Sequence, residues 1–179
     1  MTTPEHSPPP APSDDADAPE PSASKDRQTP ETTPAADAGR PRVLEAGAER
    51  GRGWEAVVRV VLERGGVRAT SERKAVGEEA VLFRCTAEAT LEALEELLGG
   101  RTRFALVGAK RMLAFDSAVL LACVRTLEEE PRKLIGCVPI QDDAVEAVAC
   151  AVLHATNRMV EAIPNRNDPT TADEPTPES

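Results

Sequence analysis

The chain has 179 residues, a formal net charge of -10 and only 2% aromatic residues, which leaves room for one ordinary domain with tails. Residues 1–50 carry a net charge of -5 and residues 164–179 carry -3, so residues 51–163 are nearly neutral at -2. A nearly neutral domain between acidic tails disfavours nucleic acid as a partner.

Targeting and membrane signals are missing from the sequence. No apolar run approaches the roughly 20 residues that span a bilayer. The N-terminus also lacks the basic flank and apolar core of a signal peptide. We therefore expect a cytoplasmic protein that makes no membrane contact.

Both ends of the chain have the composition of disordered segments. Ten of the 16 prolines lie within the first 41 residues, which contain no aromatic and hardly any aliphatic side chain. Such a stretch cannot bury enough apolar surface to offset the entropy lost on ordering. The stretch from Pro164 onward is similar. We predict disordered tails at residues 1–50 and 164–179 around a domain at residues 51–163.

The domain begins with a predicted β-hairpin. Residues 54–64 are rich in valine and alternate loosely between apolar and charged side chains, and residues 67–76 alternate as well. Gly65 and Gly66 stand between them and suit a tight turn.

A helix is predicted over residues 78–98, where the period changes from two to between three and four. Glutamates occupy the opposite side, and Gly99 and Gly100 end the helix. Its apolar stripe consists of Phe83, Ala87, Leu91, Leu94 and Leu98.

Three further strands are predicted at residues 101–113, 117–127 and 132–140. The second is almost wholly apolar, as expected for a central strand. Pro139 predicts that the third strand ends there or lies at a sheet edge.

A second helix is predicted over residues 142–158, because Asp142 or Asp143 suits an N-cap and apolar residues follow at helical spacing. Small residues recur every four positions along it. They allow another backbone to approach closely, either the protein's own sheet or a helix across a dimer. These candidate interface residues are Ala147, Ala151 and Ala155.

The predicted order is ββαβββα. It indicates an α+β two-layer domain, with a mixed or antiparallel sheet covered on one face by two helices.

No catalytic machinery is evident in the sequence. His154 is the only histidine inside the domain, and no motif places a nucleophile or a carboxylate beside it. The four cysteines lack paired spacing and are expected to be free thiols. We predict no catalytic residue, no metal site and no cofactor. Alternatives that stay open are a metal or redox pair of Cys137 with Cys150, and a small enzyme built around Cys137 or His154.

Basic residues on the second group of strands give a further alternative. Gathered on one open sheet face, they would suit an adaptor or a nucleic-acid-interacting protein that also uses the flexible tails. Few aromatic residues are available for stacking on bases. These basic residues are Arg101, Arg103, Lys110, Arg111, Arg125, Arg132 and Lys133.

The second half of the domain resembles the C-terminal regulatory (allosteric and dimerisation) domain of α-isopropylmalate synthase and the related homocitrate and citramalate synthases. The resemblance rests on Asp116-Ser117-Ala118 after a strand, Gly136 after an apolar strand, Asp143 at a helix entry and Asn157-Arg158 at the close of an alanine-rich helix. The order of elements fits over residues 54–163.

This resemblance implies a non-catalytic homodimer that senses a small molecule, such as an amino acid or a 2-oxo acid, at the dimer junction. The family's catalytic barrel takes about 250 residues, and we expect none ahead of Trp54. The resemblance also implies a ligand site, whose candidate residues are Asp116, Ser117, Gly136, Asp142 and Asp143.

Overall fold

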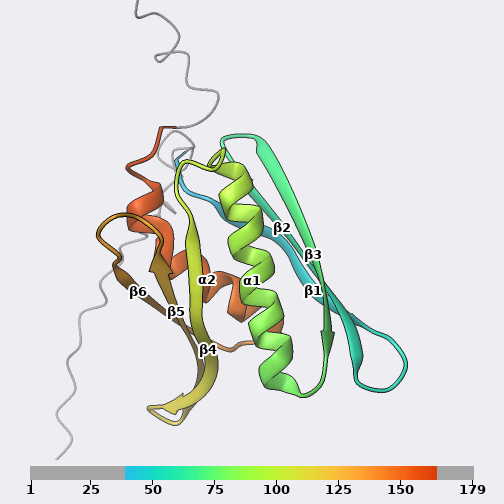
Figure 1. The fold of residues 1–179 in the computed structure, drawn as a ribbon. Coiled ribbons are helices and arrows are strands. Elements are labelled where there is room, and N and C mark those ends of the chain that lie inside the picture. Colours follow the sequence, from blue (N-terminus) through green and yellow to red (C-terminus); the bar gives the residue numbers. More distant parts are fainter. Residues whose placement is uncertain (1–38, 165–179) are drawn as a thin grey trace, which may run out of the picture. The chain divides into compact units, whose positions relative to one another are not determined.

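Six strands and two helices make up the computed structural model, which describes residues 39–164 (Figure 1). The α+β class is confirmed, and so is the ββαβββα order from residue 55 onward. Predictions about residues 1–38 and 165–179 lie outside the described part. The elements are β1 (Arg42–Arg50), β2 (Glu55–Arg64), β3 (Val67–Val76), α1 (Glu79–Leu97), β4 (Phe104–Ala114), β5 (Ser117–Thr126), β6 (Lys133–Pro139) and α2 (Ala144–Val160).

Strand β1 lies within the segment that we predicted as N-terminal tail. It pairs antiparallel with β2, with Ala46 opposite Val60 and Ala48 opposite Val58. The predicted tail is therefore too long at its C-terminal end. Ala46 and Ala48 are partly buried against the core, and Val60 and Val58 opposite them are fully buried.

The strands form two three-stranded antiparallel sheets, β1-β2-β3 and β4-β5-β6, and not the single sheet that we expected. Helix α1 packs on the first sheet and on the edge strand β4 of the second, and α2 packs on the second sheet and on the edge strand β1 of the first. In Figure 1, α1 lies in front of the first sheet and α2 behind the second. Helix α1 contacts both sheets because its buried side chains cover more than half of its circumference, from Phe83 to Leu97. Strand β6 ends at Pro139 on a sheet edge, as predicted.

The fold is an internal duplication of a βββα unit. The first unit is β1-β2-β3-α1 and the second is β4-β5-β6-α2, with the same strand order in each sheet. The first strand of each unit carries an irregularity near its start, between Val43 and Glu45 in β1 and between Leu106 and Gly108 in β4. Each helix packs on the second and third strands of its own unit and on the first strand of the other. The two units therefore share one core.

A buried arginine ties the end of β2 to the end of α2. Arg64 is 5% exposed and donates hydrogen bonds to the carbonyl oxygens of Gly39 (2.8 Å), Val160 (2.8 Å) and Ile163 (2.5 Å). The last carbonyls of a helix have no partner within the helix. Arg64 thus supplies donors that end α2 and hold both ends of the described chain on the core.

Candidate functional site

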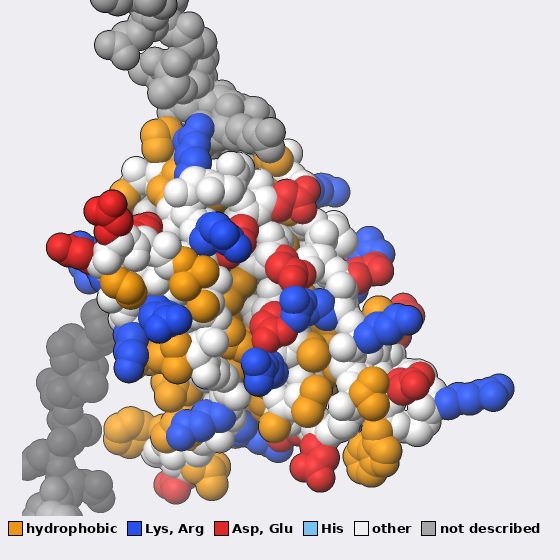
Figure 2. Space-filling model, in the orientation of Figure 1, with side chains coloured by type: hydrophobic (Ala, Val, Ile, Leu, Met, Phe, Trp, Pro, Cys, Tyr) orange, Lys and Arg blue, Asp and Glu red, His pale blue; other side chains and the backbone are white. Residues whose placement is uncertain are grey.

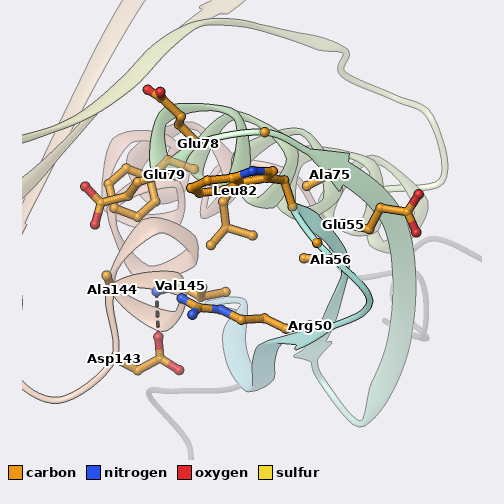
Figure 3. A pocket seen from close by; sticks show the side chains of 14 residues that line it. Arg50, Glu55, Ala56, Ala75, Glu78, Glu79, Leu82, Asp143, Ala144 and Val145 are labelled. Carbon is orange, nitrogen blue, oxygen red and sulfur yellow. Dashed lines mark hydrogen bonds between the residues drawn. The ribbon is translucent and has the colours of Figure 1, made fainter.

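A candidate site is a cavity of about 420 Å³ between the β1–β2 turn and the first residues of both helices (Figure 3). Its walls come from three segments that are distant in sequence. Leu82, Phe83 and Val145 give it an apolar side. Its charged groups are one cation and four carboxylates, which belong to Arg50, Glu55, Glu78, Glu79 and Asp143. A site of this size and mixed lining suits a small ligand with both polar and apolar parts.

Hydrogen bonds fix one wall of this cavity. The Asp143 carboxylate accepts a hydrogen bond from the amide of Val145 at 2.7 Å and so caps α2. Figure 3 shows the Arg50 side chain reaching toward this start of α2. In contrast, Glu78 precedes α1 without a side-chain cap, and its carbonyl oxygen accepts hydrogen bonds from the amides of Val81 and Leu82.

A second, more open hollow of about 620 Å³ lies at the β4–β5 hairpin. It shares Glu79 and Phe83 with the first cavity and adds Arg111 and Leu113. The β4–β5 hairpin corresponds to the β1–β2 hairpin in the duplicated unit. The two hollows are therefore neighbours, and they lie at equivalent hairpins of the two βββα units.

Large apolar side chains are exposed around these hollows. Trp54 is 75% exposed in the β1–β2 turn, and Leu113 and Phe115 are 81% and fully exposed at the β4–β5 hairpin. We call this region, with the two turns and the first residues of both helices, the hairpin end. Exposed apolar groups gathered around a cavity mark an interaction site more often than single ones do.

Phe115 also has an unusual backbone. Phe115 and Asp116 have φ of 51° and 61° and form the two-residue turn between β4 and β5. A two-residue turn with positive φ at both positions favours Asn, Asp or Gly. Asp116 therefore fits its position, whereas the backbone of Phe115 is strained. A fully exposed aromatic residue at a strained position points to a role outside the protein's own packing.

The predicted ligand residues do not form one site in the structure. Asp143 lines the first cavity, and Asp142 is exposed just before it. Asp116 and Ser117 lie at the tip of the β4–β5 hairpin, near the second hollow but outside its lining. Gly136 lies in β6 against α2 and lines neither hollow.

The alanine stripe of α2 packs on the protein's own second sheet. Ala147, Ala151 and Ala155 are 7%, 0% and 9% exposed in the single chain. A Cβ atom at Gly136 would overlap the carbonyl oxygen of Ala151 and stand 2.5 Å from the amide nitrogen of Ala155. The stripe thus permits close packing of α2 on β6, the first of the two roles open to it.

The His154 ring contacts the backbone of Cys137 in β6 and not its thiol. His154 Nδ1 lies 2.9 Å from the carbonyl oxygen of Cys137 and 3.3 Å from its amide nitrogen. Burial, with a smaller contribution from Glu146, raises the pKa of the Cys150 thiol and disfavours its reactive thiolate form. Among residues 39–164, no group of three or more His, Cys, Asp or Glu side chains is placed to hold a metal ion.

Sequence reasoning missed Arg50, Leu82 and Trp54 in the cavity wall. The signal available for them was weak, because Arg50 lay in the predicted tail and Leu82 fell outside the predicted helical stripe. Trp54 is the only tryptophan of the chain, and its position just before a strand did not indicate exposure.

Neither helix in the described part of the chain is long and apolar enough to cross a membrane. Comparison with models of known protein families gives no match, and comparison with curated proteins gives no significant match. The resemblance to the regulatory domain of α-isopropylmalate synthase therefore stays a prediction.

Proposed function

We propose that this chain is a non-catalytic regulatory module that binds a small metabolite at the hairpin end and pairs there with a second copy. The observation that carries the proposal is the cavity of about 420 Å³ where the β1–β2 turn meets both helix starts. Its lining joins one cation and four carboxylates to an apolar wall, and it has the volume of a small-ligand site.

The lining suits a small amino acid with an aliphatic side chain. Arg50 matches the charge of its carboxylate, and the carboxylates of the lining match the charge of its ammonium group. These carboxylates belong to Glu55, Glu78, Glu79 and Asp143. Leu82 and Val145 offer an apolar surface to the side chain. A 2-oxo acid, the other ligand class that we expected, has no ammonium group, so the lining favours an amino acid.

Pairing at the hairpin end follows from its exposed apolar side chains. Trp54, Leu113 and Phe115 are mostly or fully exposed in the single chain, and burying each would contribute about 1.5–3 kcal/mol. The alanine stripe of α2 is already buried, so the hairpin end is the better candidate for self-association.

The ligand proposal is tested by the melting temperature of the full chain with a panel of branched-chain amino acids and 2-oxo acids. A compound that binds only the folded state raises the melting temperature as its concentration rises. We expect Arg50→Glu to abolish this rise. Arg52→Glu is the matched control, because Arg52 is an exposed arginine of the same turn outside the cavity lining. No rise with any compound would contradict the sensor role.

Sedimentation of the full chain across micromolar concentrations tests the pairing separately. We expect a dimer that weakens on Phe115→Asn and persists with Thr70→Asn on the first sheet. A monomer at every concentration would refute the pairing but leave ligand binding to be judged on the thermal data.

A further inference from the structure

The outer face of the β4-β5-β6 sheet, which points away from the helices, is apolar at its centre. In β5, Leu120, Ala122 and Val124 are fully buried on the helix side, so the alternate residues point outward. Residues that lie opposite each other in an antiparallel pair point to the same face of the sheet. The residues of β4 and β6 opposite the outward residues of β5 therefore also point outward. We call this surface the outer patch, with Met112, Val119, Leu121, Cys123, Ile135 and Cys137 as its apolar members.

The duplication provides an internal comparison for the outer patch. The corresponding face of β2–β3 carries two pairs of opposite charge and one uncharged pair, whereas the face of β5–β6 carries two apolar pairs and one pair of cations. The cross-strand pairs Glu63–Arg68, Val61–Thr70 and Arg59–Glu72 correspond to Arg125–Lys133, Cys123–Ile135 and Leu121–Cys137.

Ion pairs satisfy some cations of the first sheet, but Arg68 and Lys74 of that sheet make none within the described residues. Arg42 pairs with Glu63 at 2.7 Å and Arg59 with Glu72 at 3.1 Å. The outer patch has three cations, Lys110, Arg125 and Lys133, which make no ion pair within residues 39–164. In Figure 2, the side of β4–β6 shows hydrophobic side chains beside Lys and Arg, with Asp or Glu at its upper edge, whereas Lys and Arg alternate with Asp and Glu over α1.

The outer patch is large enough to bind a protein segment. Three strands spaced about 4.8 Å apart, over about six residues each, give a face of roughly 300 Å² with its cations included. On the edge strand β6, Ile135 is 65% exposed and Cys137 is exposed as well. Exposed apolar side chains rimmed by polar residues often mark an interaction site.

We propose that the outer patch binds an acidic amphipathic segment of another protein. Aliphatic side chains of that segment cover Leu121, Ile135 and Cys137, and its carboxylates meet the cations at the border. Charge complementarity of this kind selects the partner and its orientation.

Other occupants fit the outer patch less well. A second copy would bring six cations and no acid to the interface, which is repulsive. Residues 1–38 supply acids but contain no Val, Leu, Ile, Phe, Trp or Tyr, so they would leave the apolar centre uncovered. A nucleic acid would find cations but no exposed aromatic side chain for stacking on this face.

The test uses Cys137 as a probe that the outer patch already contains. The full chain is alkylated in the presence of a synthetic amphipathic peptide with leucine on one helical face and glutamate on the other. We expect several-fold slower alkylation of Cys137, measured by mass spectrometry, and unchanged alkylation of Cys85. A twin peptide with lysine in place of glutamate is expected to give no protection.

Variants locate the binding surface. Ile135→Glu, or Arg125→Glu with Lys133→Glu, is expected to weaken peptide binding at least about tenfold in fluorescence anisotropy. Thr70→Glu is the matched control, because Thr70 holds the corresponding exposed position on the first sheet. Circular dichroism checks that each variant is folded.

Four results would overturn the proposal. They are full alkylation of Cys137 with the acidic peptide present, equal protection by the lysine twin, protection by a single-stranded oligonucleotide instead of the peptide, and protection that rises with protein concentration alone. The last would assign the outer patch to a second copy.

Discussion

Gly136 of β6 lies so close to Ala151 of α2 that no side chain fits between the strand and the helix. A Cβ atom at Gly136 would overlap the carbonyl oxygen of Ala151. Because the clash is with backbone, a rotamer change cannot relieve it.

We expect Gly136→Ala to lower the free energy of unfolding by about 1–3 kcal/mol, the usual cost of overpacking a core. Urea denaturation measures the change. Gly108→Ala is the matched control, since Gly108 lies in β4 with nothing within 4 Å of an added Cβ. A comparable loss at both glycines would contradict the packing of α2 on β6.

Replacing Arg64 with methionine removes the donors that end α2. The carbonyls of Val160 and Ile163 would then lose their charged partner, and we expect a loss of about 3 kcal/mol in unfolding free energy. Arg68→Met, at an exposed position, is expected to change it by no more than about 0.5 kcal/mol. Amide hydrogen exchange should locate the Arg64 effect at the end of α2.

Phe115→Asn is expected to stabilise the single chain while weakening its self-association. Asparagine tolerates the left-handed backbone of this turn, so the variant recovers about 0.5–1 kcal/mol of strain. Chemical denaturation of the dilute, monomeric chain measures this gain. Leu113→Asn, which removes a similar exposed side chain without backbone strain, should give no stabilisation.

A carboxylate on α1 makes stability depend on acid pH. Hydrogen bonds from Arg73 and Ser71 hold the pKa of Glu92 below its usual range, against a smaller opposing contribution from burial. A carboxyl with a lowered folded pKa stabilises the protein above its unfolded pKa, and this contribution disappears as pH falls through the folded value.

We therefore expect Glu92→Gln to reduce stability near pH 7 by no more than about 1 kcal/mol, because the pair is partly exposed. The difference from the unaltered protein should shrink to nothing as pH falls below the usual carboxyl range. Urea titrations at several pH values measure it, and Glu96→Gln at an exposed position serves as the control. A difference that stays constant into acid would show that the pair does not form.

Most elements could be predicted from the sequence because their periodicity is strong. The apolar positions of α1 and the almost wholly apolar β5 leave little ambiguity. Strand β1 was missed because Ala46, Gly47 and Ala48 have weak strand preference and follow a proline-rich segment.

The duplication and the cavity could not be predicted in the same way. Equivalent positions of the two units carry different kinds of side chain. The charged pair Arg59–Glu72 of the first unit corresponds to the uncharged pair Leu121–Cys137 of the second. The cavity wall joins Arg50, Leu82 and Val145, which only the packing of one unit on the other brings together.

The crossed packing of the two units has a consequence for how the chain assembles. Because β1 packs on α2 and β4 packs on α1, neither unit contains a complete core. Fragments produced by cleavage at Gly99–Gly100 would each be unstable alone and would recover the native structure only when mixed. We therefore expect each half of the chain to reach its native structure only when it packs on the other half.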